Sequence, residues 1–294
     1  MVRAVLDRIF AAVLVAVHGA PAVPTVIHRP APPALIYPTV LSPGPFTPAL
    51  SAKSYLSIDL ADGSVIYGRR PHQRRPIASL TKMMTGILTA ERGDLGRRVR
   101  VPVAATKVEP NKDDLRPGAR YTRGLLLESA LMISANDSAY ALGYDLGGGN
   151  MARFYGLMNG AAADLGMRDT HYASPNGLDD ARNRSSANDQ AIVAWYALGD
   201  PTFRRIVGTR LKRVSWAAPV HAKDYRNHNK MLFGYRGTYG VKTGFTTKAG
   251  ACLVVAVRRG DRNVIGVLLD SRDIWTDMPR LIDASLKRAS PVAS

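Results

Sequence analysis

Strand-like patterns stand near both ends of the chain, and helix-like patterns fill the sequence between them. The pair Asp62-Gly63 is a hairpin signal between the first two strands, and a glycine turn at Gly260 separates the last two. This order predicts a mixed α/β (α+β) fold, in which the first and last strands pair in an antiparallel sheet flanked by helices, with a helical insertion subdomain between them. The predicted strands cover residues 54–60, 64–67, 239–243, 249–257 and 263–270.

Apolar residues recur at helical spacing through the middle of the chain and again near its C-terminus. Thr122 is placed to cap one helix, and Gly166 is a stop signal for another. No internal repeat is visible. Apart from the helix that Thr122 caps, the predicted helices cover residues 79–91, 137–146, 151–165, 186–198 and 275–287.

The N-terminal residues have the features of a secretory signal peptide. Arg3 and Arg8 flank its start, an apolar stretch covers residues 9–17, and Ala20-Pro21-Ala22 resembles a cleavage site. Because the apolar stretch is too short to span a bilayer, a cleaved leader over residues 1–22 is favoured over an uncleaved, shallow anchor. We therefore expect an extracytoplasmic protein in the periplasm or cell wall.

Proline is frequent between this leader and the first strand. Residues 23–50 are therefore predicted to be a Pro-rich spacer in extended polyproline II conformation. The spacer either holds the domain away from a surface or has no role. The folded domain is expected over residues 51–290.

A net charge of +17 at pH 7 favours anionic surroundings. No nucleic-acid motif accompanies the charge and the basic residues are scattered, so we expect a solvated basic surface with peripheral attraction to an anionic cell wall or membrane, and no nucleic-acid partner. The single cysteine, Cys252, excludes an intramolecular disulfide and lies in an apolar run that suits a buried, inert thiol. The histidines lack metal-ligand spacing, so no metal is expected.

Ser79 and Lys82 are spaced as a nucleophile and its base. At a helix start, residues i and i+3 share a face, so the amine can reach the hydroxyl. A serine hydroxyl is a weak nucleophile until a base removes its proton. Lysine serves as that base only if burial or a second cation lowers the pKa of its amine. Lys242 is a candidate for the second cation. The same two residues also suit a helix N-cap and a solvated lysine.

The tripeptide Ser134-Ala135-Asn136 lies between two predicted helices. A loop serine can relay a proton, and an asparagine amide can hold a carbonyl and a lysine at once. The tripeptide also suits the end of one helix followed by an N-cap at Asn136 or Asp137. These three residues alone favour the capping interpretation.

Lys242, Thr243 and Gly244 close a predicted strand. Lysine supplies charge, threonine supplies a hydroxyl donor, and glycine lets a substrate backbone approach, which together suit a carboxylate clamp. The alternative is a strand end followed by a glycine turn.

In this order the three motifs resemble the S-x-x-K, S-D-N and K-T-G set of penicillin-binding proteins and class A β-lactamases. Their flanks narrow the resemblance to D-alanyl-D-alanine carboxypeptidases of peptidase family S11. Residues 76–85 resemble that family's proline and small residue before serine, followed by T-K-(M/L)-(M/L)-T. The S-A-N form followed by Asp137 fits S11 and departs from S-D-N, and residues 239–250 resemble G-x-K-T-G-(H/Y/F)-T-x-x-A-G.

Two further segments extend the resemblance, which covers about residues 51–288. Residues 171–178 resemble T-H-(F/Y)-x-N-P-(T/N)-G-L, with a departure at Ala173-Ser174. Residues 228–232 resemble N-x-N-x-L-L, with His228 where some relatives carry arginine.

The resemblance implies a serine D,D-carboxypeptidase that removes the terminal D-alanine from peptidoglycan stem peptides, needs no cofactor, and is inhibited covalently by β-lactams. It implies catalytic roles for Ser79, Lys82 and Ser134, with the backbone N–H groups of Ser79 and Phe245 forming an oxyanion hole. The implied substrate-binding residues are Asn136, Lys242, Thr243, Gly244 and Phe245.

Three alternatives share this fold. A β-lactamase needs a deacylation base, typically glutamate in an E-x-x-L-N segment, and the sequence has no such segment. A D,D-endopeptidase would use the same residues. A non-catalytic wall-binding module would not need Ser79, Lys82 and Lys242 together.

Overall fold

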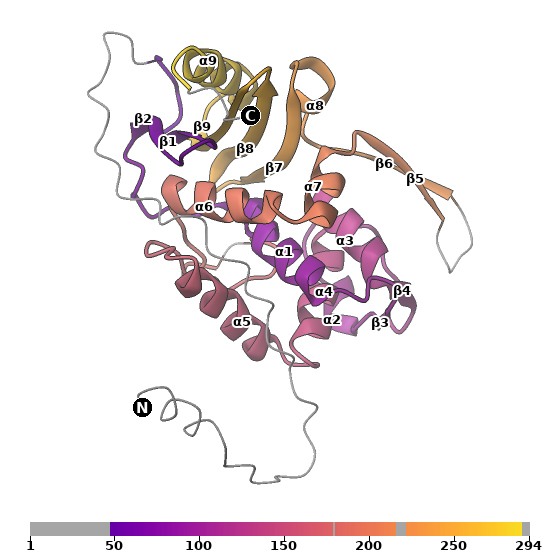
Figure 1. Cartoon of the computed structure of the whole chain (residues 1–294). Helices are drawn as coiled ribbons and strands as arrows, with labels where there is room; N and C mark the ends of the chain where they lie inside the picture. The colour runs from indigo at the N-terminus through magenta and orange to yellow at the C-terminus, as the bar shows by residue number, and fades with distance from the viewer. Residues whose placement is uncertain (1–47, 179, 216–221, 290–294) are drawn as a thin grey trace, which may run out of the picture.

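The computed structural model describes residues 48–178, 180–215 and 222–289. The predicted leader and most of the predicted spacer lie outside these residues. Figure 1 shows three layers: a C-terminal helix, a sheet, and a group of helices on the opposite face of the sheet. Within the described ranges, no helix has the length and apolar character needed to cross a membrane.

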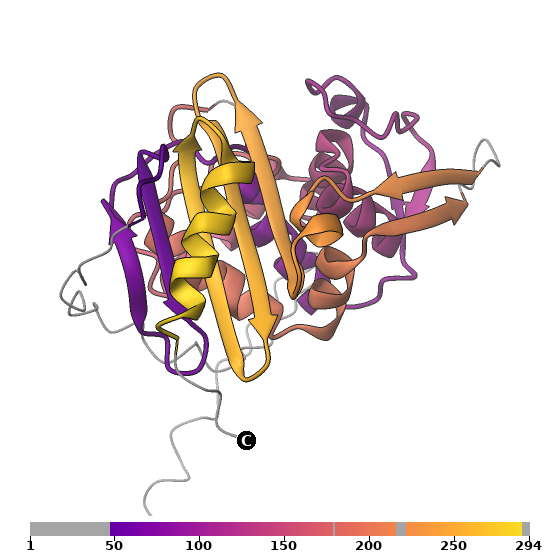
Figure 2. The same cartoon turned by 90° about the horizontal axis from the view of Figure 1, so that it is seen from above.

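The sheet confirms the predicted pairing of the chain's two ends. It has five strands in the order β2-β1-β9-β8-β7, and every neighbouring pair is antiparallel. Figure 2 looks onto this sheet with the C-terminal helix lying across it. The strands are β1 (Ser54–Asp59), β2 (Val65–Arg69), β7 (Thr238–Thr246), β8 (Gly250–Arg259) and β9 (Arg262–Ser271).

Both faces of the sheet are buried, and successive residues of β8 alternate between two cores. Val254 and Ala256 belong to the core beneath the helical layer, while Val255 and Val257 belong to the core beneath α9 (Ile274–Leu286). This period of two is the geometry of a strand. Because both sets of alternating side chains are buried, the central strands are almost uniformly apolar.

The predicted long helices form, with shifts of one to three residues at their ends. Thr122 Oγ1 accepts from the Leu125 N–H at 3.2 Å, and Ser186 Oγ accepts from the Asp189 N–H at 3.2 Å, so both predicted starts are capped. Gly166 has φ +72°, the left-handed conformation of a stop signal. These helices are α1 (Lys82–Arg92), α3 (Arg123–Met132), α4 (Asn136–Leu146), α5 (Met151–Asp164) and α6 (Ala187–Leu198).

Several short elements were not predicted. The β5–β6 ribbon projects from the body in Figure 2, and α7 (Pro201–Gly208) packs against β7. Asp200 caps α7 by accepting from the Phe203 N–H at 2.9 Å, with proline in its first turn. The others are β3 (Arg98–Arg100), α2 (Val103–Thr106), β4 (Arg120–Thr122), β5 (Leu211–Ser215), β6 (Ala222–Arg226) and α8 (Met231–Gly234).

A buried carboxylate ties the two ends of the domain together. Asp277 on α9 accepts from the Ser51 N–H at 3.0 Å, the Ser51 hydroxyl at 2.7 Å and the Ala52 N–H at 3.1 Å. The Ser271 hydroxyl at the end of β9 donates to the same carboxylate at 2.7 Å. The segment entering β1 is therefore fixed to the last helix.

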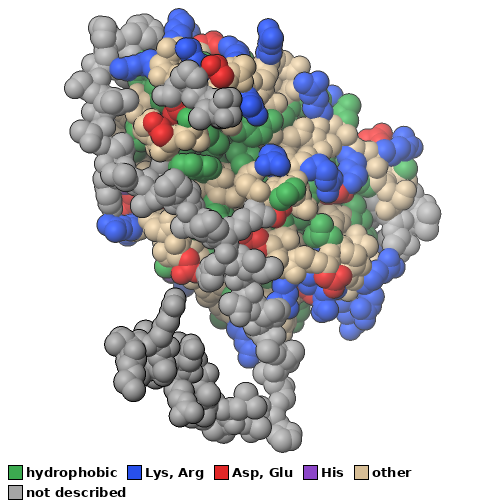
Figure 3. All heavy atoms as spheres, viewed as in Figure 1, with side chains coloured by type: hydrophobic (Ala, Val, Ile, Leu, Met, Phe, Trp, Pro, Cys, Tyr) green, Lys and Arg blue, Asp and Glu red, His purple; other side chains and the backbone are tan. Residues whose placement is uncertain are grey.

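Cys252 is fully buried on β8, and burial raises the pKa of its thiol to about 12. The expectation of a buried thiol is confirmed. Among the described residues, no group of three or more His, Cys, Asp or Glu side chains is arranged to hold a metal ion. Figure 3 shows Lys and Arg side chains spread over many elements of one face rather than gathered in one band.

Candidate active site

The three sequence motifs meet in one cleft between the sheet and the helical layer. The cleft has a volume of about 760 Å³. The start of α1, the loop between α3 and α4, and the end of β7 form its walls. The predicted site residues that line it are Ser79, Ser134, Asn136, Thr243, Gly244 and Phe245.

Ser79 lies in a short 3₁₀ turn, η1 (Ala78–Thr81), that runs directly into α1. The helix predicted to begin at Ser79 therefore begins with this tighter turn. Ala78 has φ +46°, a left-handed conformation that is unusual for a residue with a Cβ and is common at functional turns. The Ser79 side chain makes no capping hydrogen bond for either helix, so the N-cap interpretation is wrong.

Lys82 is completely buried, so the solvated-lysine interpretation is also wrong. Its Nζ atom lies 2.8 Å from Ser79 Oγ, 2.7 Å from Asn136 Oδ1 and 2.7 Å from the Asn176 carbonyl oxygen. These three partners account for the three N–H donors of an ammonium group. When the amine is neutral, it has a lone pair in place of one donor, and the serine hydroxyl can donate to it.

The environment favours that neutral amine. Burial lowers the pKa of Lys82 well below its ordinary value, the charge of Lys242 lowers it further, and Asp137 opposes both effects. A lysine with a strongly lowered pKa is able to take a proton near neutral pH. The second cation expected to act on Lys82 is therefore Lys242, as predicted.

Lys242 lies on β7 with its side chain 1% exposed. Burial lowers the pKa of Lys242 to about 7, and its Nζ donates to the Thr243 carbonyl oxygen at 3.0 Å. A carboxylate bound beside it would favour the charged form. Thr243 lines the cleft, whereas Lys242, its neighbour in the sequence, is buried and is not among the lining residues.

The loop between α3 and α4 presents Ser134 and Asn136. Ser134 has φ +63°, a left-handed conformation, and its side chain is 7% exposed. Asn136 is the first residue of α4, and its side chain donates to the Glu109 carbonyl oxygen at 2.9 Å while its oxygen accepts from Lys82. The N-cap of α4 is Ala135, and it makes no side-chain capping bond. The N-cap expected at Asn136 or Asp137 is therefore wrong, whereas the expected helix end is confirmed, because Ser134 directly follows Ile133, the C-cap of α3.

Gly244 is required where β7 passes the Ser79 turn. A Cβ atom at this position would lie 2.9 Å from the Ser79 backbone nitrogen and 3.1 Å from the Ile77 carbonyl oxygen. The close approach brings the backbone of β7 beside the Ser79 N–H. The Phe245 side chain, 70% exposed, comes next at the cleft rim.

Asn176 and Gly177 belong to the site, although no catalytic or binding role was predicted for them. The Asn176 carbonyl accepts from Lys82, and Gly177 packs so tightly on the nucleophile turn that a Cβ would lie 1.8 Å from the Ala78 carbonyl oxygen. Gly177 also has φ +86°. The signal available in the sequence was the Pro175-Asn176-Gly177 turn.

Asp137 and His228 are two further residues that the prediction did not assign. The buried Asp137 carboxylate accepts from the Asp113 N–H at 3.0 Å and the Leu115 N–H at 3.1 Å, which fixes the segment beside the cleft. His228 lines the cleft, where burial and the charges of Lys242 and Lys82 lower the pKa of its imidazole to about 4. His228 is therefore neutral at pH 7.

Comparison with known proteins gives one consistent family. A family model described as D-alanyl-D-alanine carboxypeptidase, Peptidase S11, matches residues 42–273. The chain is 31% identical to a D-alanyl-D-alanine carboxypeptidase of Streptomyces strain K15, over 77% of this chain and 83% of the relative. It is 30% identical to a D-alanyl-D-alanine endopeptidase of Escherichia coli, over 78% of this chain and 74% of that relative.

The fold has a solved counterpart. The crystal structure of the Streptomyces K15 DD-transpeptidase superimposes with a TM-score of 0.78 at 28% identity. The match covers 82% of this chain and 99% of the solved chain. The predicted fold class is confirmed.

Proposed function

This chain belongs to the D-alanyl-D-alanine carboxypeptidase family of peptidases, S11, and we propose that its cleft removes the terminal D-alanine from peptidoglycan stem peptides with Ser79 as nucleophile. It is a serine-type D-Ala-D-Ala carboxypeptidase, a hydrolase of the penicillin-binding group. The observation that carries the residue assignment is the 2.8 Å contact between Lys82 Nζ and Ser79 Oγ. That contact lies in a cleft beside a second buried lysine.

Acylation begins when the neutral Lys82 amine takes the Ser79 hydroxyl proton. The Ser79 oxygen attacks the carbonyl carbon between the two D-alanines, and the carbonyl oxygen gains negative charge. The Ser79 and Phe245 N–H groups donate to that oxygen, which stabilises the tetrahedral intermediate. Lys242 and Thr243 hold the substrate's terminal carboxylate, which explains why a free C-terminus is recognised.

Collapse of the intermediate breaks the peptide bond and needs a proton on the leaving nitrogen. Ser134, with Lys242 nearby, donates this proton to the leaving nitrogen. Lys82 then passes the proton that it took from Ser79 to Ser134. D-alanine then leaves as the free amino acid. Water attacks the Ser79 ester, with Lys82 again as base, and releases the shortened peptide and the free serine.

A synthetic pentapeptide ending in D-Ala-D-Ala tests the activity directly. We expect a mass spectrum of the products to show the tetrapeptide and free D-alanine, with many turnovers per enzyme. An intact pentapeptide after prolonged incubation with folded enzyme would refute the proposed activity.

A D,D-endopeptidase is the second candidate function, and the Escherichia coli relative is named as one. The two reactions share nucleophile and base and differ in the group on the leaving side of the scissile bond. A cross-linked peptide dimer separates them: an endopeptidase divides the dimer into two monomers, whereas a carboxypeptidase only trims a free D-alanyl end. The ratio of the two rates decides the assignment.

A β-lactamase would form the same Ser79 ester and would hydrolyse it quickly. Among the described residues that line the cleft, Glu109 carries the sole carboxylate, and its side chain is exposed. The leaving group of a penicilloyl ester stays tethered and obstructs water, whereas D-alanine diffuses away. We therefore expect penicillin consumption to nearly stop after one equivalent, and sustained rapid hydrolysis without D-alanine release would favour the β-lactamase.

Family members act on the cell wall, outside the cytoplasm. We propose that residues 1–22 deliver the protein there as a cleaved leader and that residues 23–50 space the catalytic domain, residues 51–290, from it. Basic residues over the surface support peripheral attraction to anionic wall or membrane material. N-terminal sequencing of secreted protein is expected to begin near Val23, and full-length protein confined to the cytoplasm would refute the leader.

A further inference from the structure

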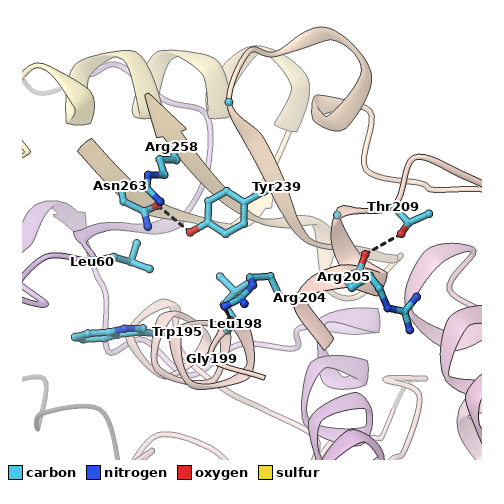
Figure 4. A pocket seen from close by; sticks show the side chains of 12 residues that line it. Leu60, Trp195, Leu198, Gly199, Arg204, Arg205, Thr209, Tyr239, Arg258 and Asn263 are labelled. Carbon is cyan, nitrogen blue, oxygen red and sulfur yellow. Dashed lines mark hydrogen bonds between the residues drawn. The ribbon is translucent and has the colours of Figure 1, made fainter. Parts of the chain in front are cut away.

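A second cavity lies outside the catalytic cleft, between helices α6 and α7 and one end of the sheet. Its volume is about 1000 Å³, larger than that of the catalytic cleft. Figure 4 shows Trp195 and Leu198 on the α6 side and Tyr239 reaching toward them from β7. Leu60 closes one end. The cavity thus has two aromatic side chains and two aliphatic ones on facing walls.

Three arginines border these apolar walls. Arg204 and Arg205 come from α7, and Arg258 comes from the end of β8. Of the described residues that line the cavity, none is Asp or Glu. A cavity lined by one sign of charge, with low-dielectric walls, concentrates counter-ions of the opposite sign.

The arginines are poorly neutralised by the protein itself. Within the described part of the chain, neither Arg204 nor Arg258 pairs with a carboxylate, and Arg204 uses one N–H to bond the Leu198 carbonyl oxygen at 3.1 Å. Arg205 lies 3.8 Å from Glu128, which Lys212 already holds at 2.5 Å. Most of the guanidinium donors therefore remain for a ligand.

The polar end of Tyr239 lies within the same charged region. Its hydroxyl donates to Asn263 Oδ1 at 2.8 Å. Burial raises the pKa of Tyr239, and the Asn263 bond and the charges of Arg258 and Arg204 oppose that rise. The positive charges of Arg258 and Arg204 thus both act on the Tyr239 hydroxyl, although the two arginines come from elements far apart in the sequence.

We propose that this cavity binds a phosphodiester-linked sugar chain, with sugar rings against Trp195 and Tyr239 and a phosphate on Arg204 and Arg258. Aromatic side chains pack against ring faces while keeping a polar edge wet, and guanidinium groups match phosphate oxygens bidentately. Arg204 and Arg258 are exposed at the border of the cavity, so the site is open enough for a longer chain to continue past it on either side. The cavity is a binding site and takes no part in the chemistry at Ser79.

The cavity and the catalytic cleft border the same strand. Tyr239 is the second residue of β7 and Thr243 the sixth, so the two positions are about 13 Å apart at the usual rise per strand residue. A polymer held in the cavity would raise the local concentration of attached stem peptides at the cleft. This consequence rests on the proposed carboxypeptidase function, whereas the binding itself does not.

The test is calorimetric titration of the folded protein with a synthetic phosphodiester-linked hexose tetramer. The neutral tetrasaccharide and inorganic phosphate serve as comparison ligands. We expect the phosphorylated tetramer to bind at least about tenfold more tightly than either one, because each lacks half of the recognised chemistry. If inorganic phosphate bound as tightly as the phosphorylated tetramer, the proposed sugar contacts would be refuted. If the neutral tetrasaccharide bound as tightly, the proposed arginine contacts would be refuted.

Two double variants locate the binding. R204Q/R258Q is expected to raise the Kd at least about tenfold. R98Q/R100Q removes the same charge from exposed positions on β3 and is expected to change the Kd less than about twofold. Both variants are first checked for cooperative thermal unfolding. Equal effects of the two pairs would show that binding reflects net charge alone and would refute the site.

Acylation by penicillin separates this cavity from the catalytic cleft. Protein fully labelled at Ser79 is expected to bind the tetramer with unchanged affinity. Loss of binding after labelling would place the tetramer in the cleft and refute the proposal. A protein that penicillin fails to label would instead count against the proposed carboxypeptidase function and leave the binding measurement intact.

Discussion

The side-chain amide of Asn136 bridges Lys82 and the backbone of Glu109, a residue that lines the cleft. Its oxygen lies 2.7 Å from Lys82 Nζ, and its nitrogen donates to the Glu109 carbonyl oxygen at 2.9 Å. The two bonds fix which end of the amide faces the lysine. Asn136 therefore holds the base without adding a charge to it.

Asn136→Asp tests that arrangement. The new carboxylate would raise the pKa of Lys82 and lose the bond to Glu109, so we expect acylation by fluorescent penicillin to slow by about 10²-fold, with the acidic limb of the pH–rate profile moving to higher pH. Asn150→Asp, at the exposed N-cap of α5, makes the same chemical change and should leave the rate unaltered. An Asn136→Asp enzyme with an unshifted profile would contradict this role.

Ser79→Ala should abolish covalent labelling by penicillin while the thermal unfolding transition stays near that of the wild type. The lost hydroxyl is only half-buried, so little packing is removed. Ser134→Ala should keep its label and form it more slowly, because a proton relay assists but does not become acylated. A labelled peptide mapped to any residue other than Ser79 would refute the nucleophile assignment.

Gly177→Ala should damage both stability and acylation. A methyl group there collides with the Ala78 carbonyl and must adopt φ +86°, so we expect a loss of more than about 2 kcal/mol in the free energy of unfolding. Gly156→Ala on α5 meets no atom within 4 Å and should stabilise the protein by about 0.5–1 kcal/mol. Chemical denaturation of the two variants measures both changes, and similar effects would contradict the close packing.

Lys242 should set an alkaline limb in the pH dependence of kcat/KM for substrates with a free C-terminal carboxylate. A lysine is charged below its pKa, which burial lowers to about 7, so the clamp loses its charge as pH rises through that range. Lys242→Arg keeps the charge at all accessible pH values and should remove the limb. The limb should also vanish for a substrate amidated at its C-terminus, and its persistence there would exclude Lys242 as the source.

Local signals were enough to predict the long helices and the five strands of the main sheet. Thr122 and Ser186 mark helix starts through bonds to N–H groups three residues on, and such contacts depend on nearby sequence alone. The three motifs could be interpreted from the sequence because a nucleophile, a base and a carboxylate clamp depend on the type of side chain present.

The rest depended on contacts between distant segments. Asn176 acts through its backbone carbonyl, which every residue possesses, so its residue type gave no sign of a bond to Lys82. Burial lowers the pKa of the His228 imidazole, and the charges of two lysines from other elements lower it further, so the shift depends on how distant segments pack. Likewise, the Arg204–Arg258 cavity exists only once α7 packs against β7, the strand that pairs with β8.

The Asp277 carboxylate that holds Ser51 and Ala52 has a consequence for the order of events during biosynthesis. A chain is made from its N-terminus, so the first strand exists long before β9 and α9 can cover it. The sheet therefore cannot close until almost the whole domain has been synthesised. A polypeptide that stays open for so long is still able to pass through a narrow export channel, as the proposed leader requires.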